Sequence, residues 1–151
     1  MNRRWISPPV AFAIAAIVMW LIGRNVEFGR YSFAHQTSIG IALVVLGVLI
    51  VVSSLRLFRA AGTTPNPMQP KNATQLVTSG AYAVSRNPMY VGDVVMLVGI
   101  GMWIGSVLNV ATIAIFIWYI DRFQIADEER ALVEIFSDQY EAYRRRVRRW
   151  I

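Results

Sequence analysis

Three long charge-free stretches stand out in the pattern of hydrophobic and polar positions along the chain. They cover residues 5–23, 36–55 and 94–120. A hydrocarbon core about 30 Å thick needs roughly 20 helical residues at about 1.5 Å each. The pattern therefore predicts transmembrane helices near residues 5–23 and 38–57. We interpret the first as a retained span rather than a signal peptide, because no small-residue cleavage site precedes Gly23-Arg24.

The third stretch is long for one crossing of the bilayer and short for two. Gly105-Ser106 and Asn109 interrupt it midway, as a tight turn would. A single crossing would place the arginine-rich tail opposite the arginine-bearing loop that precedes this stretch, against the positive-inside tendency. We therefore expect two short helices, near residues 88–105 and 107–121, which thin the bilayer locally at a modest cost. Four spans then leave both termini on the cytoplasmic side.

Two cytoplasmic segments complete the predicted fold. The first is a long loop over residues 59–85, which three prolines interrupt. The second is the tail over residues 122–147, which has the spacing of a helix with one apolar side. We predict an all-α integral membrane helical bundle in the cytoplasmic (inner) membrane, with about four transmembrane helices, a C-terminal amphipathic helix and a single domain over residues 1–151. The apolar side of the tail carries Ile125, Glu129, Leu132, Phe136, Tyr140, Tyr143 and Val147.

Composition supports the bilayer as the solvent of this chain. Hydrophobic residues make up 56% of the sequence and charged residues 16%, which is too apolar for an ordinary soluble domain. The net charge of +6 does not indicate nucleic acid, because the arginines cluster at the ends of apolar runs, where the headgroups of membrane lipids explain them. The chain has no cysteine, which removes thiolate nucleophiles and cysteine metal sites, and we predict no metal.

Glu129 falls on the apolar side of the tail helix, where an unpaired carboxylate would be costly. One interpretation is a ligand with hydroxyl or ammonium donors; the others are an ion pair with Arg86 or Arg144, or an edge position that reaches water. Its neighbour Glu128 lies about 100° around the helix, so that two carboxylates can meet one ligand. Arg144 can approach the same side as Glu129, whereas the other arginines of the run predict a headgroup-binding surface. Asp121 is interpreted as an interface residue.

A second group of candidate residues lies at the entrance to the third span. Pro88 suits the first turn of a helix and Asn87 is a candidate cap, which predicts a helix N-terminus that faces the cytosol. Arg86 adds a fixed charge that can grip a carboxylate through two parallel hydrogen bonds. The alternative is a capped span whose Arg86 and Tyr90 anchor the interface. Asp93 sits about one turn inside the helix, where an acidic group needs a partner.

These residues together resemble the isoprenylcysteine carboxyl methyltransferase family, which is related to the phospholipid methyltransferases. The resemblance covers about the carboxyl-terminal three-fifths of the chain in order and spacing, and the first two spans match only as hydrophobic helices. Two departures concern Asn87, where many eukaryotic relatives have histidine, and the end of the chain at Trp150-Ile151. The matching residues are Thr78-Ser79-Gly80-Ala81-Tyr82, Arg86-Asn87-Pro88-Met89-Tyr90-Val91-Gly92, and Glu128-Glu129 followed by Leu132, Phe136, Tyr140, Tyr143 and Val147.

The resemblance implies a membrane enzyme that binds S-adenosylmethionine in a cytosol-facing pocket and accepts a lipophilic substrate from the bilayer. Its methyl transfer would leave S-adenosylhomocysteine. Membrane lipids and a lipophilic small molecule are the implied partners. Carried onto matching positions, the cofactor-binding residues would be Gly80, Tyr82, Arg86, Asn87, Pro88, Tyr90, Glu128, Glu129, Tyr140, Tyr143 and Arg144.

Methyl transfer from a sulfonium is an in-line displacement, so alignment of the two reactants and exclusion of water are the main requirements. A carboxylate, thiolate or free amine needs no base, whereas a hydroxyl substrate would need a carboxylate such as Glu129 or Asp93. The candidate catalytic residues are therefore Glu129 and Asp93, together with the charge of Arg86. The alternative function is a non-catalytic membrane scaffold or lipid-binding protein that keeps the fold; a small transporter has less support, because the polar residues gather near one face.

Overall fold

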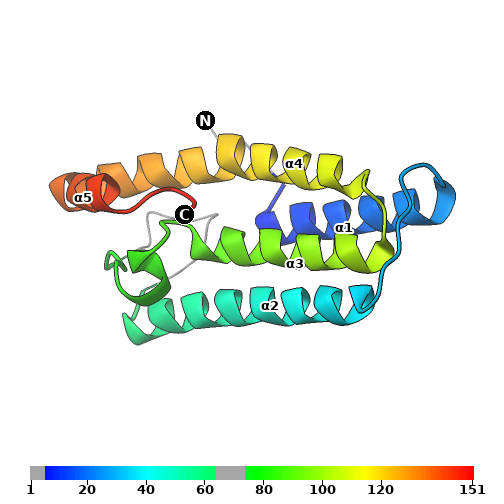
Figure 1. The fold of residues 1–151 in the computed structure, drawn as a ribbon. Coiled ribbons are helices and arrows are strands. Elements are labelled where there is room, and N and C mark those ends of the chain that lie inside the picture. The colour runs from blue at the N-terminus through cyan, green and yellow to red at the C-terminus, as the bar shows by residue number, and fades with distance from the viewer. Residues whose placement is uncertain (1–5, 64–73) are drawn as a thin grey trace.

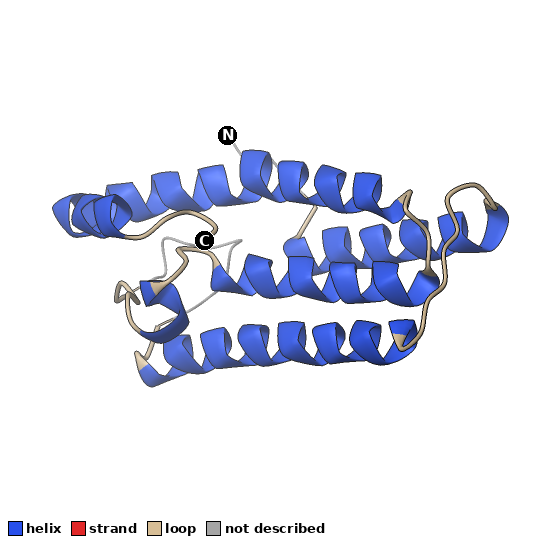
Figure 2. Cartoon of the chain, viewed as in Figure 1, coloured by secondary structure: helices blue, strands red, loops and turns tan. Residues whose placement is uncertain are grey.

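The computed structural model describes residues 6–63 and 74–151, and within these ranges the chain is built from helices and loops (Figures 1 and 2). The predicted all-α class is confirmed. Trp5 and the three loop prolines of the sequence analysis lie outside the described residues. The helices are α1 (Pro8–Asn25), α2 (Gln36–Ala60), the short 3-10 helix η2 (Gly80–Ala83), α3 (Pro88–Ile104), α4 (Asn109–Tyr119), the π-helical segment η3 (Ile120–Ile125) and α5 (Ala126–Arg146).

Helix α3 lies at the centre of the bundle and contacts α1, α2 and α4 (Figure 1). Its residues are apolar on nearly every side, as expected for a helix that is surrounded by other helices. Met19 of α1, Leu97 of α3 and Ile120 at the start of η3 are completely buried, and Phe116 and Tyr90 join them in one core. The core therefore runs along the bundle and ends at the first turn of α3.

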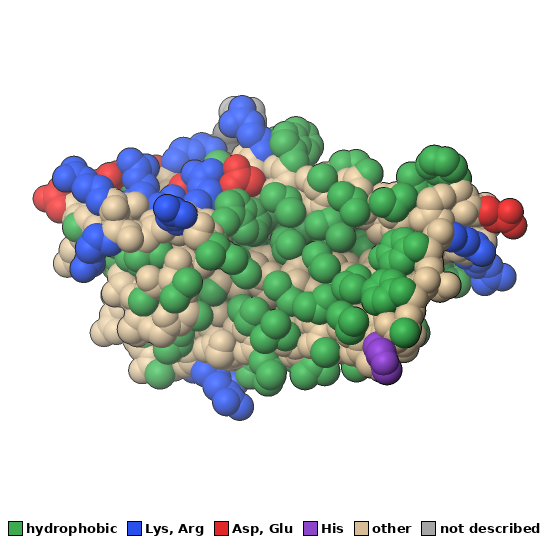
Figure 3. Space-filling model, in the orientation of Figure 1, with side chains coloured by type: hydrophobic (Ala, Val, Ile, Leu, Met, Phe, Trp, Pro, Cys, Tyr) green, Lys and Arg blue, Asp and Glu red, His purple; other side chains and the backbone are tan. Residues whose placement is uncertain are grey.

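The outer surface of the bundle is apolar. Helices α1 and α2 are long and hydrophobic enough to cross a bilayer, and only 17% of each apolar window is buried. A core helix of a soluble protein would bury most of such a window, so lipid is the better solvent for these side chains. Figure 3 shows the same division, with charged side chains at the two ends of the molecule and a hydrophobic band between them. The two predicted single spans are matched by α1 and α2.

The third apolar stretch forms two helices joined by a tight turn, as the Gly105-Ser106 interruption predicts. Gly105 ends α3 with a φ of 72°, and a Cβ atom at this position would come within 2.5 Å of the Tyr31 carbonyl oxygen. Ser106 and Asn109 are buried in the turn. Helix α3 has 17 residues and α4 has 11, both short for a full crossing, so the four-span arrangement stays a proposal.

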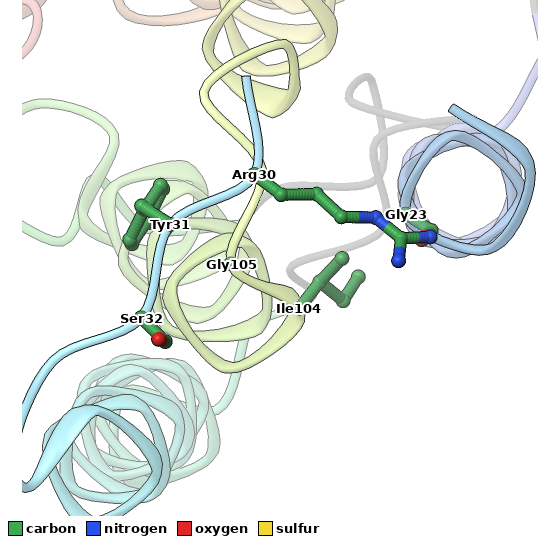
Figure 4. Close-up of a pocket in the computed structure, with 6 residues that line it drawn as sticks. All are labelled: Gly23, Arg30, Tyr31, Ser32, Ile104 and Gly105. Carbon is green, nitrogen blue, oxygen red and sulfur yellow. The ribbon is translucent and has the colours of Figure 1, made fainter. Parts of the chain in front are cut away.

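The connector between α1 and α2 is fastened to this turn. Arg30 donates from Nη2 to the carbonyl oxygen of Gly23 at 2.6 Å and from Nε to that of Val26 at 3.2 Å, so it satisfies carbonyls at the end of α1. Figure 4 shows the Arg30 side chain extended toward Gly23, across an open hollow of about 370 Å³. The Tyr31 amide donates to the Gly105 carbonyl at 2.9 Å. The charge of Arg30 therefore has a structural role at this end of the bundle.

The predicted change from span to tail at residue 122 falls within a continuous helical path. The chain passes from α4 through η3 into α5 without a break, and the helix departs from helical geometry only at Ser137, where φ is 41° and ψ is −116°. The apolar side predicted for the tail assumes one straight helix. Because the chain bends at Ser137, the stripe changes register there, and only Ile125, Glu129, Tyr140 and Tyr143 of its seven positions are buried.

Two pairs of glycines allow α2 and α3 to pack backbone against backbone. Gly47 faces Gly92, and Gly40 faces Gly99, one pair two helical turns from the other. A Cβ atom on Gly47 would lie 2.6 Å from the Gly92 carbonyl oxygen, and one on Gly99 would lie 2.6 Å from that of Gly40. Such small-residue contacts are how helices approach closely in membranes. This seam fixes α3, and with it the segment that leads into α3, against α2.

Replacing Gly47 with alanine should destabilise the protein. In most helices the change from glycine to alanine is favourable by about 0.5–1 kcal/mol, but here the added methyl group would overpack the seam at a cost of about 1–3 kcal/mol. Unfolding in detergent, followed by circular dichroism, measures the change. Val48→Ala is the control, because Val48 is the adjacent residue and points outward. A stabilised Gly47→Ala variant would contradict the packing described for the seam.

Candidate functional site

The segment that leads into α3 is packed against the end of α2. Gly80 has a φ of 59°, and a Cβ atom there would lie 2.9 Å from Leu57 of α2. This close approach brings Tyr82 over Phe58, with the rings edge to face at 5.2 Å. The Tyr82 hydroxyl is buried and has no hydrogen-bond partner among the described residues. An orphaned hydroxyl at this position is the first indication of a ligand.

Asn87 lies at the N-cap position of α3 and Pro88 at its first turn, as predicted, but the Asn87 side chain does not cap the helix. Its Nδ2 instead donates to the carbonyl oxygen of Arg149 at 3.0 Å. The Arg86 amide donates to the Arg148 carbonyl at 2.9 Å, and Ser85 and Arg148 form an isolated parallel bridge. The start of α3 is therefore joined to the end of the chain, which we call the C-terminal arm (residues 147–151).

Arg86 and Glu129 form a buried ion pair. Arg86 donates to Glu129 Oε1 from Nε at 3.0 Å and from Nη2 at 2.7 Å, and both side chains are about one-tenth exposed. The remaining guanidinium nitrogen, Nη1, donates to the carbonyl oxygens of Val147 at 2.8 Å and Arg144 at 3.2 Å. Arg86 thus satisfies the end of α5 as well as the carboxylate. Of the interpretations offered for Glu129, the ion pair with Arg86 is the one that the structure contains.

A second arginine, Arg149, holds the other oxygen of Glu129. Its Nη2 lies 2.5 Å from Glu129 Oε2, and its Nη1 lies 3.2 Å from each oxygen of Asp121. Trp150 also donates to Asp121, from Nε1 at 3.1 Å. The hydrogen bonds and ion pairs to both acids raise the pKa of Arg149 above its usual value. The prediction that groups Arg149 with the headgroup-binding arginines misses these two ion pairs, and the interface position of Asp121 stays a prediction.

Glu128 has a different environment from Glu129. Tyr90 donates to Glu128 Oε1 at 2.6 Å, and the described residues provide no cation that pairs with Glu128. Glu128 keeps some exposed surface, yet the dense surroundings of its carboxyl group remove water and raise its pKa to about 7. The Tyr90 hydrogen bond opposes this effect, and the charges of Glu129 and Asp127 add to it. The twin glutamates therefore comprise one neutralised and one uncompensated carboxylate.

Tyr140 and Tyr143 form the wall that faces η2. The Tyr143 hydroxyl donates to the Tyr82 carbonyl oxygen at 2.7 Å, and the two tyrosine rings of α5 lie edge to face at 6.0 Å. Burial raises the pKa of Tyr143 to about 12 and raises that of Tyr140 further, so both hydroxyls are neutral. These two residues reach the site because α5 bends at Ser137 and brings its last turns back toward the start of α3 (Figure 1).

The structure brings together most of the residues predicted for the site, and it places three of them elsewhere. The Arg144 side chain turns outward to Glu141, at 3.1 Å, and only its carbonyl group meets Arg86. Gly80 acts through the turn against α2. Asp93 lies a turn further along α3, close enough for its charge to act on Tyr90. The direct contacts are Arg86 with Glu129, Tyr90 with Glu128, Tyr143 with both Tyr82 and Tyr140, and Asn87 with the Arg149 carbonyl group; Pro88 lies beside them at the first turn of α3.

The helical fold, the apolar surface and the buried charged cluster at one end define a membrane-associated protein with a polar site. A sequence model described as phospholipid methyltransferase matches residues 35–139. The match covers more than two-thirds of the chain, which therefore belongs to this family. It begins before α2, so the similarity includes this helix as well as the carboxyl-terminal part.

Curated relatives narrow the similarity to isoprenylcysteine methyltransferases, as the resemblance predicts. The human protein-S-isoprenylcysteine O-methyltransferase is 31% identical over 141 residues, which are 90% of this chain and 49% of the relative. The Arabidopsis thaliana B enzyme is 25% identical over 143 residues, 94% of this chain and 73% of the relative. The Schizosaccharomyces pombe enzyme is 38% identical over 72 residues, 48% of this chain and 30% of the relative. The matched part of the chain thus spans between 30% and 73% of the length of these relatives. No solved structure matches it significantly.

Replacing Arg86 with alanine should destabilise the fold strongly. The change leaves Glu129 with one cation and removes the donors that satisfy the end of α5, so we expect a loss of about 3 kcal/mol or more. Thermal unfolding in detergent measures it. Arg144→Ala should cost about 0.5 kcal/mol or less, because its partner is at the surface. Equal effects of the two substitutions would contradict the central place of Arg86.

Proposed function

We propose that this protein transfers a methyl group from S-adenosylmethionine to a lipid-like substrate at the cytoplasmic face of the membrane. The observation that carries the proposal is the Glu128 carboxylate, which has no cationic partner among the described residues, near the buried Tyr82 hydroxyl, which has no hydrogen-bond partner among them. Glu128 also acts on the Tyr82 hydroxyl electrostatically, which supports their proximity. A positively charged ligand with hydrogen-bonding groups would satisfy both. The family membership supplies the reaction type.

S-adenosylmethionine fits this donor set. It carries a sulfonium, an ammonium, a carboxylate and ribose hydroxyls, and supplies an electrophilic methyl group when it is bound. Glu128 would meet the positive charge, and Tyr82 would hydrogen-bond to a polar group. Asn87, Pro88 and Tyr90 would border the molecule from α3, and Tyr140 and Tyr143 would close the wall. Arg86 and Glu129 would act by holding α3, α5 and the C-terminal arm together.

The protein residues mainly align the reactants and exclude water, because a methyl sulfonium needs no activation by acid. Four hydrogen bonds from Arg86 and Arg149 occupy the oxygens of Glu129, which are then not available to take a proton from a substrate. Asp93 is the better candidate if the acceptor is a hydroxyl. A carboxylate, thiolate or free amine acceptor would need no base.

An apolar groove between α1 and α4 provides a place for the hydrocarbon part of the substrate. Its volume is about 340 Å³, within the range of ligand pockets, and its lining is almost entirely apolar. Tyr119 at its end donates to the Ile6 carbonyl oxygen at 3.2 Å and is followed directly by η3, which carries Asp121. The groove is lined by Ile6, Ala11, Ile14, Ala15, Val18, Thr112, Ile115, Phe116, Trp118 and Tyr119.

The cytoplasmic placement of the site rests on the positive-inside tendency. Exposed arginines gather around α5 and at the end of α2, and Figure 3 shows basic side chains over α5. Both termini would then be cytoplasmic. The exposed residues are Arg56, Arg59, Arg122, Arg130, Arg144, Arg145, Arg146 and Arg148.

Binding of S-adenosylmethionine should weaken as pH falls through about 7. Protonation removes the negative charge of Glu128, whose pKa is raised to about 7, and the affinity then falls by up to about tenfold per pH unit. Calorimetric titration between pH 6 and pH 8 measures this dependence. Glu128→Gln should bind at least about tenfold more weakly at pH 8 and lose most of the pH dependence.

Two further measurements decide between the enzyme and a protein that keeps the fold without turnover. Absence of calorimetric binding by the wild-type protein would favour a scaffold or lipid-binding role. Mass spectrometry of lipid extracts and of an S-isoprenylcysteine peptide, after incubation with a labelled methyl donor, identifies the acceptor. Donor binding without labelled product would contradict the proposed transfer reaction.

Filling the groove should impair the lipid acceptor and not the methyl donor. Thr112→Trp places an indole ring in the groove, and we expect at least about a tenfold lower kcat/KM for the acceptor, a change of about 1.4 kcal/mol. The Kd of S-adenosylmethionine should stay unchanged. Val110→Trp is the matched control on an outward face of α4. Equal activity of the two variants would remove the groove from the proposal.

A further inference from the structure

The C-terminal arm is fixed at both its backbone and its side chains. Its backbone accepts hydrogen bonds from the Arg86 amide at Arg148 and from the Asn87 side chain at Arg149. The Ser85 hydroxyl makes a longer contact, 3.4 Å, with the Arg149 carbonyl oxygen. The arm therefore runs beside the three residues that precede α3. This position directs the Arg149 side chain toward the acidic residues of η3 and α5.

Arg149 connects two acidic residues that lie eight positions apart on one continuous helical path. One side of its guanidinium meets both oxygens of Asp121, and the other side meets both oxygens of Glu129, at 2.5 Å for the shorter contact. Its side chain is 35% exposed, whereas that of Arg86 is 10% exposed. Arg149 is thus the solvent-facing member of the pair of arginines that encloses Glu129.

The charges of this cluster compensate one another only while Arg149 is in place. Asp121 and Glu129 carry two negative charges, and Arg86 and Arg149 carry two positive charges. Without Arg149 the four groups would lose one positive charge beside the site. Glu128 is the next residue to Glu129 and would then face an additional unbalanced anion.

We propose that Arg149 is a positioning residue of the candidate methyl-donor site. From the C-terminal arm, Arg149 orients and neutralises Glu129. Of the twin glutamates, Glu128 is then the carboxylate that meets the positive charge of the ligand. This inference rests on the proposed function and assigns different tasks to the twin glutamates. Glu129 connects the arm to the start of α3, whereas Glu128 binds the positively charged group of the ligand. It also gives the arm a role in ligand binding.

The groups that surround Glu128 determine how the loss of Arg149 would be detected. Tyr90 of α3 donates to it, Tyr82 of η2 lies within electrostatic reach, and Glu129 and Asp127 flank it on its own helix. Asp127 is paired with Arg130 on the exposed side. Glu129 already raises the pKa of Glu128, so the removal of its neutralising arginine raises that pKa further. A purely structural role for Arg149 would not move this value.

The test is the pH dependence of S-adenosylmethionine binding by Arg149→Ala in detergent. We expect the midpoint to rise by about one pH unit, which lowers the affinity at pH 7 about fivefold, because the ionised fraction of Glu128 falls from about one half to about one tenth. Arg149→Lys keeps the charge and should retain the wild-type midpoint. Arg148→Ala is the matched control, since its side chain is exposed and outside the cluster.

Trypsin digestion of the ligand-free protein provides a second readout, which does not depend on the methyl donor. Cleavage after Arg145 and Arg146 should be several-fold faster in Arg149→Ala than in Arg148→Ala, because the arm loses its side-chain attachment. An unshifted midpoint in Arg149→Ala, or equal cleavage of the two variants, would overturn the role of Arg149. If the wild-type protein binds no S-adenosylmethionine, the proposed function is contradicted. If the wild-type protein binds it and the pH midpoint of Arg149→Ala is unshifted, only the inference about Arg149 is contradicted.

Discussion

The arrangement of this site depends on one buried carboxylate that two arginines share. Glu129 receives hydrogen bonds from Arg86 at the start of α3 and from Arg149 on the C-terminal arm, so three segments far apart in sequence meet at one group. A buried charge is tolerated only when it is paired, and leaving one partner alone is strongly unfavourable. The cluster therefore specifies where the arm and α5 lie, more than it adds to stability. The glycine seam supplies the other half of this constraint, because it fixes α3 against α2 in the apolar part of the molecule.

The sequence predicts the helices and the break at Gly105 because both follow from local chemistry. Long apolar runs specify helices in lipid, and Gly105 specifies the end of α3. The glycine seam is invisible in one sequence, since Gly40 and Gly47 acquire meaning only when Gly99 and Gly92 face them. The π-helical segment is equally hidden, because a helical pattern that continues through residues 120–125 gives no signal for an extra residue in one turn.

The site shows the same division between local and non-local information. Arg86 and Glu129 could be chosen because a charge at a helix entrance and a carboxylate on an apolar face are unusual in themselves. Their pairing was one of several alternatives, and only the folded chain selects it. Arg149 had no distinguishing signal within a run of arginines. Its position follows from the end of α5 at Arg146 and the extended backbone at Val147, which turn alternate residues of the arm to opposite sides.

The contrast between Glu128 and Glu129 shows why adjacent identical residues need not have one function. Both lie at the start of α5, but the helix directs them about 100° apart. The Glu129 side chain points into two guanidinium groups, whereas the Glu128 side chain accepts from a tyrosine hydroxyl and has no cationic partner in the part of the chain that the structure describes. Water is scarce at both positions, so the uncompensated carboxylate has the greater demand for a positive partner. The apolar surface of the bundle suits a lipid acceptor, and the Glu128 carboxylate at its polar end suits a cationic donor. Such a molecule can bring the two together, because only the donor must leave water to bind.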